Sequence, residues 1–158
     1  MKFAPSLKQI KFCIVGAGVS GIMCGHFFRL MGVQFDIIEK GSAPGGTWYW
    51  NRYPGIGCDI ESHLYSLSFF RKSDWSKVFS LGDEIQEYMI AAWKFAKESR
   101  QFLLKCSPLI DSRNISYFEN WPKLEKYSKF NCEVTKAVWK KDEEVWEVTF
   151  TDMSFRIK

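Results

Sequence analysis

The feature that most constrains the fold is a glycine-rich turn between a strand pattern and a helix pattern. Residues 10–15 (IKFCIV) form a short apolar run with β-branched residues, which is typical of a buried strand. The turn GAGVSG follows at 16–21, and apolar residues then recur three and four positions apart until Gly32 ends the predicted helix. A second strand is predicted over 33–39 (VQFDIIE). This order predicts a parallel βαβ unit with a right-handed crossover.

Each glycine of this G-x-G-x-x-G turn has a physical role in binding a pyrophosphate. Gly16 permits the tight turn, Gly18 lets the backbone approach phosphates, and Gly21 lets the helix pack closely on the sheet. The helix N-terminus offers free N–H groups and partial positive charge. Glu39 ends the second strand, where a carboxylate accepts hydrogen bonds from ribose hydroxyls and disfavours a 2′-phosphate. The pattern predicts a Rossmann-like α/β fold that binds FAD or NAD, and the alternative is a glycine-rich turn in an unrelated α/β protein.

The remaining patterns predict a long loop, a second helix and a hairpin. Residues 41–63 are rich in Gly, Pro and Trp, and so long a loop inside a compact domain is usually functional. The S-x-x-D pattern at 80–83 predicts the start of a helix over 83–97. Two alternating stretches joined by the polar run KKDEE predict a β-hairpin over 130–151.

Composition excludes several classes of partner. The net charge of +4 is scattered along the chain without a basic run, so no nucleic-acid partner is expected. No apolar stretch reaches the roughly 18 residues of a membrane span, and the N-terminus lacks a signal-peptide pattern. The 5 cysteines are odd in number and form no C-x-x-C pair, so neither a disulfide framework nor a metal site is indicated. We therefore expect a cytoplasmic protein with reduced thiols.

The long loop carries a motif that resembles one enzyme family. Residues 45–55 read GGTWYWNRYPG, with CDIES following at 58–62 and YSLSF at 65–69. Together they closely resemble the second flavin-contacting stretch of Baeyer–Villiger monooxygenases, and the resemblance runs over about 10–97 and resumes near 127. Simpler flavin monooxygenases share the leading Gly-Gly pair but usually not the whole block. By this resemblance the chain is identified as the N-terminal FAD-binding part of a class B flavin-dependent monooxygenase.

The resemblance implies a cofactor contact at each matching position. The pyrophosphate is expected to contact Gly16, Gly18, Ser20 and Gly21, and the adenosine ribose to contact Glu39. The ribityl chain with its phosphates is expected beside Gly46, Thr47 and Trp48. The isoalloxazine is expected beside Asp59, Ile60 and Tyr65, and the adenine beside the backbone of Val134. In this family an Asp matching Asp59 also orients an active-site arginine, so Asp59 is the catalytic candidate. Loop packing is the alternative role for Trp48, and turn formation is the alternative for Asp59.

The implied activity is an oxygenation that needs more protein than this chain supplies. In the family, NADPH reduces FAD, O₂ adds to form a C4a-peroxyflavin, and oxygen is inserted next to a carbonyl or onto a heteroatom of a small organic substrate. The NADPH-binding domain is absent here, because no second G-x-G-x-x-G occurs and no glycine follows Gly82. Two other interpretations remain: an inactive truncated FAD-binding module, or one completed by another chain, and an N- or S-oxygenating flavin-containing monooxygenase. A flavin disulfide reductase is disfavoured because no redox cysteine pair follows the glycine turn.

The chain is therefore expected to be a partial FAD-binding domain over 1–158, an incomplete three-layer fold. It divides into a βαβ dinucleotide fold at 8–40, a flavin-contacting loop at 41–70, the helix at 83–97, an insertion at 98–122 and the hairpin at 130–151. The family passes quickly from the helix to the next strand, whereas residues 98–122 show neither helix nor strand periodicity. We interpret them as an insertion of non-coding origin, such as an unspliced intron.

None of three other reactive side chains is assigned a catalytic role. His26 falls on the apolar helix stripe and is expected to be a hydrogen-bonded core histidine. His63 follows the loop but has no identifiable partner acid or nucleophile. Cys58 is expected to be a buried small residue, because no redox partner is near it in sequence.

Overall fold

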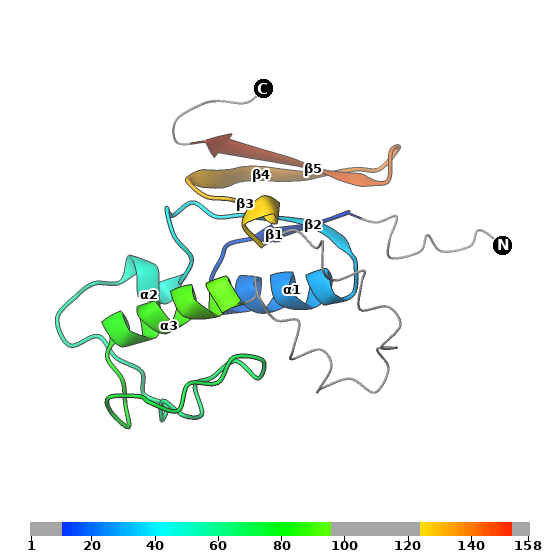
Figure 1. The fold of residues 1–158 in the computed structure, drawn as a ribbon. Helices are drawn as coiled ribbons and strands as arrows, with labels where there is room; N and C mark the ends of the chain where they lie inside the picture. The colour runs from blue at the N-terminus through cyan, green and yellow to red at the C-terminus, as the bar shows by residue number, and fades with distance from the viewer. Residues whose placement is uncertain (1–10, 96–123, 153–158) are drawn as a thin grey trace, which may run out of the picture.

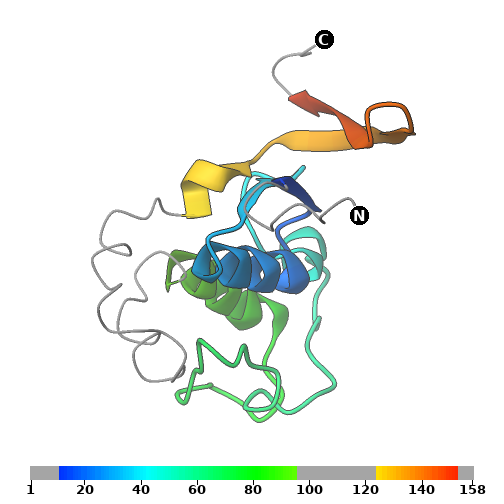
Figure 2. The ribbon, with the colours of Figure 1, turned by 90° about the vertical axis from the view of Figure 1, so that its right-hand side faces the viewer.

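A computed structural model describes residues 11–95 and 124–152 of the chain. In chain order the elements are β1 (Lys11–Val15), α1 (Val19–Leu30), β2 (Gln34–Ile38), α2 (Thr47–Trp50), α3 (Gly82–Phe95), the 3₁₀ turn η3 (Leu124–Tyr127), β3 (Ser128–Lys129), β4 (Cys132–Lys140) and β5 (Val145–Asp152). They form three layers (Figure 1): the helices α1 and α3 on one side, the parallel strands in the middle, and the β4–β5 hairpin beyond them. The view turned by 90° shows the same order of layers (Figure 2).

The middle layer is a short parallel sheet in the order β1-β2-β3. Strand β1 pairs with β2 in register, with Ile14 opposite Ile37, and β3 adds to the far edge of β2. The predicted βαβ unit is therefore confirmed. Among the described residues β1 has no partner on its other edge, and Val15 at its end is 67% exposed. Natural sheets usually protect their edge strands, whereas this edge is unpaired within the described residues.

Helix α1 packs closely on the sheet because it presents a glycine where the two meet. A Cβ atom added to Gly25 would lie 2.8 Å from the Ile37 side chain. The largest fully buried side chains of the core are Phe35, Ile22, Ile37, Ile85, Met89, Leu124, His26 and Ser80. Apart from Ser80, which lies just before α3, they come from α1, β2, α3 and η3, so the core joins segments far apart in the chain.

His26 belongs to this core, but the prediction that it is hydrogen-bonded is wrong. Its ring stacks on Phe69 with the centroids 3.9 Å apart, and within the described part of the chain neither ring nitrogen has a hydrogen-bond partner. Burial, helped by the nearby charge of Arg29, lowers its pKa to about 4, so the ring is neutral at pH 7. Aromatic stacking takes the place of the expected hydrogen bond.

The hairpin is antiparallel, as predicted, with β4 ending at Lys140 and β5 beginning at Val145. Trp139 lies opposite Trp146, with ring centroids 5.6 Å apart, and both indoles are largely exposed. Such aromatic cross-strand pairs stabilise a hairpin. The third layer therefore presents aromatic surface to solvent.

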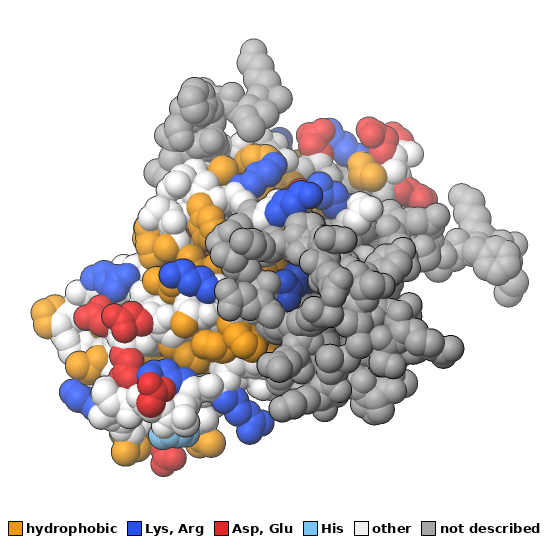
Figure 3. Space-filling model, viewed as in Figure 1, with side chains coloured by type: hydrophobic (Ala, Val, Ile, Leu, Met, Phe, Trp, Pro, Cys, Tyr) orange, Lys and Arg blue, Asp and Glu red, His pale blue; other side chains and the backbone are white. Residues whose placement is uncertain are grey.

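Helix length, possible metal ligands and surface charge can each be described for residues 11–95 and 124–152. None of their helices is long and apolar enough to cross a membrane. No group of three or more His, Cys, Asp or Glu side chains within 11–95 and 124–152 is placed to hold a metal ion. On the face drawn in Figure 3, Lys and Arg are scattered among Asp and Glu. The predicted insertion at 98–122 lies outside the described residues.

Candidate cofactor-binding site

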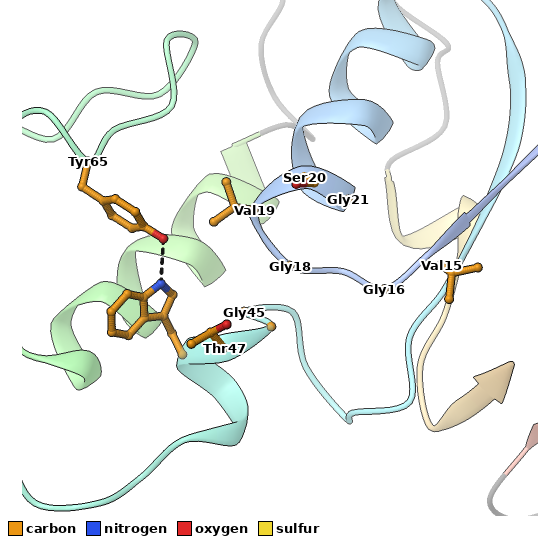
Figure 4. A pocket seen from close by; sticks show the side chains of 11 residues that line it. Val15, Gly16, Gly18, Val19, Ser20, Gly21, Gly45, Thr47 and Tyr65 are labelled. Atoms are coloured by element: carbon orange, nitrogen blue, oxygen red, sulfur yellow. Dashed lines mark hydrogen bonds between the residues drawn. The ribbon is translucent and has the colours of Figure 1, made fainter. Parts of the chain in front are cut away.

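A cavity of about 370 Å³ lies where the glycine turn faces the Gly-Gly loop (Figure 4). Its lining consists of Val15, Gly16, Gly18, Val19, Ser20, Gly21, Gly45, Gly46, Thr47, Trp48 and Tyr65. The volume is within the range of small-molecule sites. None of these described lining residues is charged, so an anionic ligand would depend on backbone N–H groups and the helix dipole.

The N-terminus of α1 is open to an anion. The helix begins at Val19 with Gly18 as its N-cap, no side chain caps it, and its first turn contains no acidic residue. The first N–H groups of a helix have no acceptor within the helix, and they carry the positive end of its dipole. Since Gly18 to Gly21 line the cavity, this end is placed to bind a phosphate.

Two glycines let the turn and the loop come together with bare backbone. A Cβ atom on Gly46 would lie 2.9 Å from the Cα of Gly18, closer than real Cβ contacts allow. Gly46 also has a positive φ of 57°, which disfavours any side chain. Beside them the N–H of Gly45 donates to the carbonyl of Ala17 at 3.0 Å. The cavity wall on both sides is therefore peptide backbone, which fits the pyrophosphate of a dinucleotide.

Glu39 lies beside this cavity and outside its lining. Its side chain is buried, and its two carboxylate oxygens accept the N–H of Ala17 at 2.7 Å and of Gly41 at 2.6 Å. The carboxylate thus ties the glycine turn to the start of the loop. Each oxygen keeps a further lone-pair site, so both can still accept a hydroxyl donor. The predicted bond to a ribose stays a prediction.

Trp48 and Tyr65 form the aromatic part of the cavity lining. The indole Nε1 of Trp48 donates to the hydroxyl oxygen of Tyr65 at 3.0 Å, the bond that Figure 4 marks with a dashed line. Their rings meet edge to face, with centroids 5.9 Å apart, and Trp48 is only 7% exposed. The hydrogen bond orients Tyr65 across from the Gly-Gly loop, where a flat ring system could pack.

Eight of the predicted contact residues line the cavity together: Gly16, Gly18, Ser20, Gly21, Gly46, Thr47, Trp48 and Tyr65. Asp59 and Ile60 are exposed on the loop outside the lining, and Val134 is half-buried on β4, also outside it. The catalytic role of Asp59 stays a prediction.

Two further side chains from the sequence analysis, His63 and Cys58, lie outside the cavity lining. His63 is exposed, and its Nε2 lies 3.3 Å from the carbonyl oxygen of Ser73. Cys58 is half-buried and packs against the core, whereas the sequence predicted a buried residue. The difference arises because Cys58 lies in the exposed part of the loop rather than on a core strand.

Three lining residues were not predicted: Val15, Val19 and Gly45. Each directly adjoins a predicted residue, so position within the two motifs was the available signal. Two residues of α3 make hydrogen bonds to the loops that carry lining residues, without lining the cavity themselves. They are Gln86 and Tyr88, and no motif in the sequence distinguishes them from other helix residues.

The chain is similar to known dinucleotide-binding domains and to FAD-binding monooxygenases. Residues 14–80 match the family model described as NAD(P)-binding Rossmann-like domain. The chain is 30% identical over 146 residues to the FAD-binding monooxygenase stcW of Emericella nidulans, covering 91% of this chain and 20% of that protein. It is 37% identical over 98 residues to a Baeyer–Villiger monooxygenase of Pseudomonas aeruginosa, covering 61% and 19%. The crystal structure of OTEMO in complex with FAD and NADP superposes with a TM-score of 0.70 at 27% identity, covering 97% and 24%.

The fold and the site therefore define a Rossmann-like dinucleotide-binding domain. Its homologues are FAD-binding monooxygenases, among them Baeyer–Villiger monooxygenases. The chain spans about a fifth of the length of the relatives it matches.

Proposed function

We propose that the chain binds FAD as the N-terminal cofactor-binding part of a flavin-dependent monooxygenase of the Baeyer–Villiger type. The observation that carries this proposal is the uncharged, backbone-walled cavity at the N-terminus of α1. A dinucleotide pyrophosphate suits such a site, because the helix end and the close Gly18–Gly46 approach offer N–H groups without steric obstruction.

The residues divide the cofactor between them. The glycine turn with Ser20 would hold the pyrophosphate, and Glu39 would accept ribose hydroxyls on its remaining lone pairs. The segment from Gly46 to Trp48 would contact the phosphates and the ribityl chain, and Tyr65 would border the flavin ring. Asp59 and Ile60 are proposed beside that ring, and the Val134 backbone beside the adenine.

The proposed reaction is NADPH-dependent oxygenation of a small organic substrate by O₂. Bound FAD would supply the redox and oxygen chemistry, while the described residues bind it, orient it and shield its phosphates. NADPH binding and substrate recognition are assigned to protein beyond this chain, since the relatives are about five times as long. We also propose a cytoplasmic location, which the exposed, unpaired thiols of Cys13 and Cys24 support; cell fractionation tests it.

Titration of the purified 158-residue chain with FAD tests the proposal. Quenching of flavin fluorescence should give saturable binding, and FMN should bind more weakly because it lacks the adenosine half that the glycine turn holds. Gly18→Val would fill the phosphate position and should weaken FAD binding at least about 100-fold, as expected for overlap with a ligand phosphate. Cys24→Val, on the exposed side of the same helix, is the matched control.

Equal binding of FAD and FMN, or unchanged binding by Gly18→Val, would contradict the assignment of the glycine turn. NADPH oxidation measured on the same sample separates the interpretations of activity. FAD binding without NADPH oxidation would identify a cofactor-binding module that depends on further protein. Turnover with an added ketone or sulfide would show that the chain acts alone.

A further inference from the structure

Helix α3 contributes no residue to the described cavity lining, yet it contacts both segments that form one side of the cavity. Its N-terminal residue Gly82 packs beside Trp48, where an added Cβ would lie 3.6 Å from the indole ring. Two further residues on the helix, Gln86 and Tyr88, make hydrogen bonds to the loops that carry Gly46 and Tyr65. The helix is therefore a support for the cavity rather than part of it.

Gln86 contacts the Gly-Gly loop from helix α3. Its side-chain Nε2 donates to the carbonyl oxygen of Pro44 at 2.7 Å, and the residue is 4% exposed. A Cβ atom on Gly45 would lie 1.9 Å from the Gln86 Oε1, so the amide fills the space under that glycine. The same Oε1 has no hydrogen-bond partner in the described residues. The amide therefore acts on this loop through one donated bond and through its shape.

Tyr88 fixes the segment that follows Tyr65. Its hydroxyl oxygen accepts the N–H of Leu67 at 2.7 Å, and the hydroxyl donates to the carbonyl of Phe70 at 2.6 Å. The side chain is 2% exposed, and burial raises the pKa of its phenol, so the proton needed for the second bond is retained. Both bonds are to backbone atoms, so they fix the path of the chain near Tyr65.

Residues two apart on an α-helix project about 200° from each other. Gln86 and Tyr88 therefore reach in nearly opposite directions from one rigid helix, the first to the loop at Pro44 and the second to the segment at Leu67. The Pro44 segment leads into Gly46 and the Leu67 segment follows Tyr65, so α3 contacts the backbone next to both lining residues.

We propose that Gln86 and Tyr88 are positioning residues that set the separate halves of the FAD site, Gln86 the phosphate half and Tyr88 the flavin half. This inference rests on the proposed FAD binding. Because each residue is assigned to one half of FAD, a ligand that contains only one half can distinguish the effects of the two residues. ADP corresponds to the adenosine and phosphate half alone.

The test compares dissociation constants for ADP and FAD on the full chain, by calorimetry and fluorescence. Gln86→Met keeps the volume but removes the donor, and it should weaken ADP and FAD alike by about tenfold, the effect of one buried carbonyl left unpaired. Tyr88→Phe removes only the hydroxyl, and it should weaken FAD about fivefold, leave ADP unchanged and shift the visible spectrum of bound flavin. Glu87→Gln, between them on the exposed side, should match the wild type.

A second variant covers the case in which Gln86→Met does not fold. With Gln86→Glu, only the protonated carboxyl can donate to the Pro44 carbonyl, so ADP affinity relative to wild type should rise as the pH is lowered. Circular dichroism at each pH shows whether the variant stays folded, so a recovery of ADP binding without a change in the spectrum reports the hydrogen bond.

The inference is overturned if wild type binds both ligands and Gln86→Met, once folded, binds ADP within about twofold of it, or if Gln86→Glu shows no recovery on acidification. It is also overturned if Tyr88→Phe weakens ADP as much as FAD, because that pattern indicates general destabilisation. Failure of wild type to bind either ligand would instead overturn the proposed function, and this inference with it.

Discussion

The cavity has two walls that are built in different ways. The turn wall, residues 16–21, is contiguous in sequence, beginning directly after β1 and ending in the first turn of α1. The loop wall, comprising residues 45–48 and Tyr65, is supported by side chains of α3, and Gln86 on that helix binds Pro44, 42 positions earlier in the chain. The turn wall is fixed by the sterics of its own backbone, whereas the loop wall depends on a few hydrogen bonds from elsewhere. A substitution that violates a steric constraint should therefore destabilise the protein strongly. Removal of a supporting hydrogen bond should have a smaller effect that can be measured separately.

The two walls meet at Ala17. Its carbonyl accepts the N–H of Gly45, and its own N–H donates to the Glu39 carboxylate. Glu39 in turn binds Gly41 at the start of the loop. Substitutions in the turn wall, at this junction and in the loop wall should therefore have different magnitudes.

The largest effect is expected in the turn wall, from Gly21→Ala. The added Cβ would lie 2.0 Å from the carbonyl oxygen of Gly16, and backbone cannot move away without opening the turn. We expect a loss of about 3 kcal/mol or more in the free energy of unfolding, together with loss of FAD binding. Urea denaturation measures it, with Cys24→Ala as the control on the exposed side of α1. A variant that unfolds like wild type would show that the turn is not sterically fixed.

His26 connects the two regions, because this α1 residue stacks on Phe69 from the segment that Tyr88 holds. Its pKa is lowered from 6.5 to about 4 by burial and then by Arg29, so the unfolded chain binds its proton first. The stability it confers is complete above about pH 6.5 and is lost as the pH falls toward 4, by up to about 3 kcal/mol. His26→Leu should flatten this part of the stability profile, whereas substitution of the exposed His63 by Asn should not. An unchanged profile in His26→Leu would assign the acid sensitivity to other groups.

At the junction, Glu39→Gln should have an intermediate effect. The amide can accept only one of the two N–H bonds, and its NH₂ group then faces the other donor. We expect about 2 kcal/mol of destabilisation, typical of a buried charged acceptor that loses a partner. Asp36→Asn on the preceding strand β2 is the control, since its ion pair with Lys11 is partly solvent-exposed and should contribute under about 1 kcal/mol. Equal thermal shifts for the two variants would argue against the junction.

The smallest effect is expected in the loop wall, from Trp48→Phe. The change removes the Nε1 donor to Tyr65 and should cost about 1 kcal/mol. Tyr65→Phe removes the same bond from the other side, so the effects of the two changes should not add in the double variant. Simple additivity in urea denaturation would mean that the bond does not hold Tyr65.

Much of the turn wall could be predicted from the sequence. The strand, the glycine turn and the helix are each encoded within a few residues, and the structure confirms the βαβ order. The hydrogen bonding of His26 could not be predicted, because it depends on Phe69, which is 43 positions away in the chain. The hydrogen bonds that the N–H groups of Ala17 and Gly41 donate to the Glu39 carboxylate could not be predicted either, because the sequence pattern indicates only the position of the acid.

By itself, the sequence determined which backbone can approach a phosphate, because glycine sterics and strand and helix periodicity are local properties. It also carried the Gly-Gly-Thr-Trp block that relates the chain to FAD-binding monooxygenases. The tertiary structure alone decided which side chains hold that block in place. Gln86 and Tyr88 acquire their partners only when α3 packs beside the loops, and a contact between residues 42 apart leaves no trace in the spacing of either.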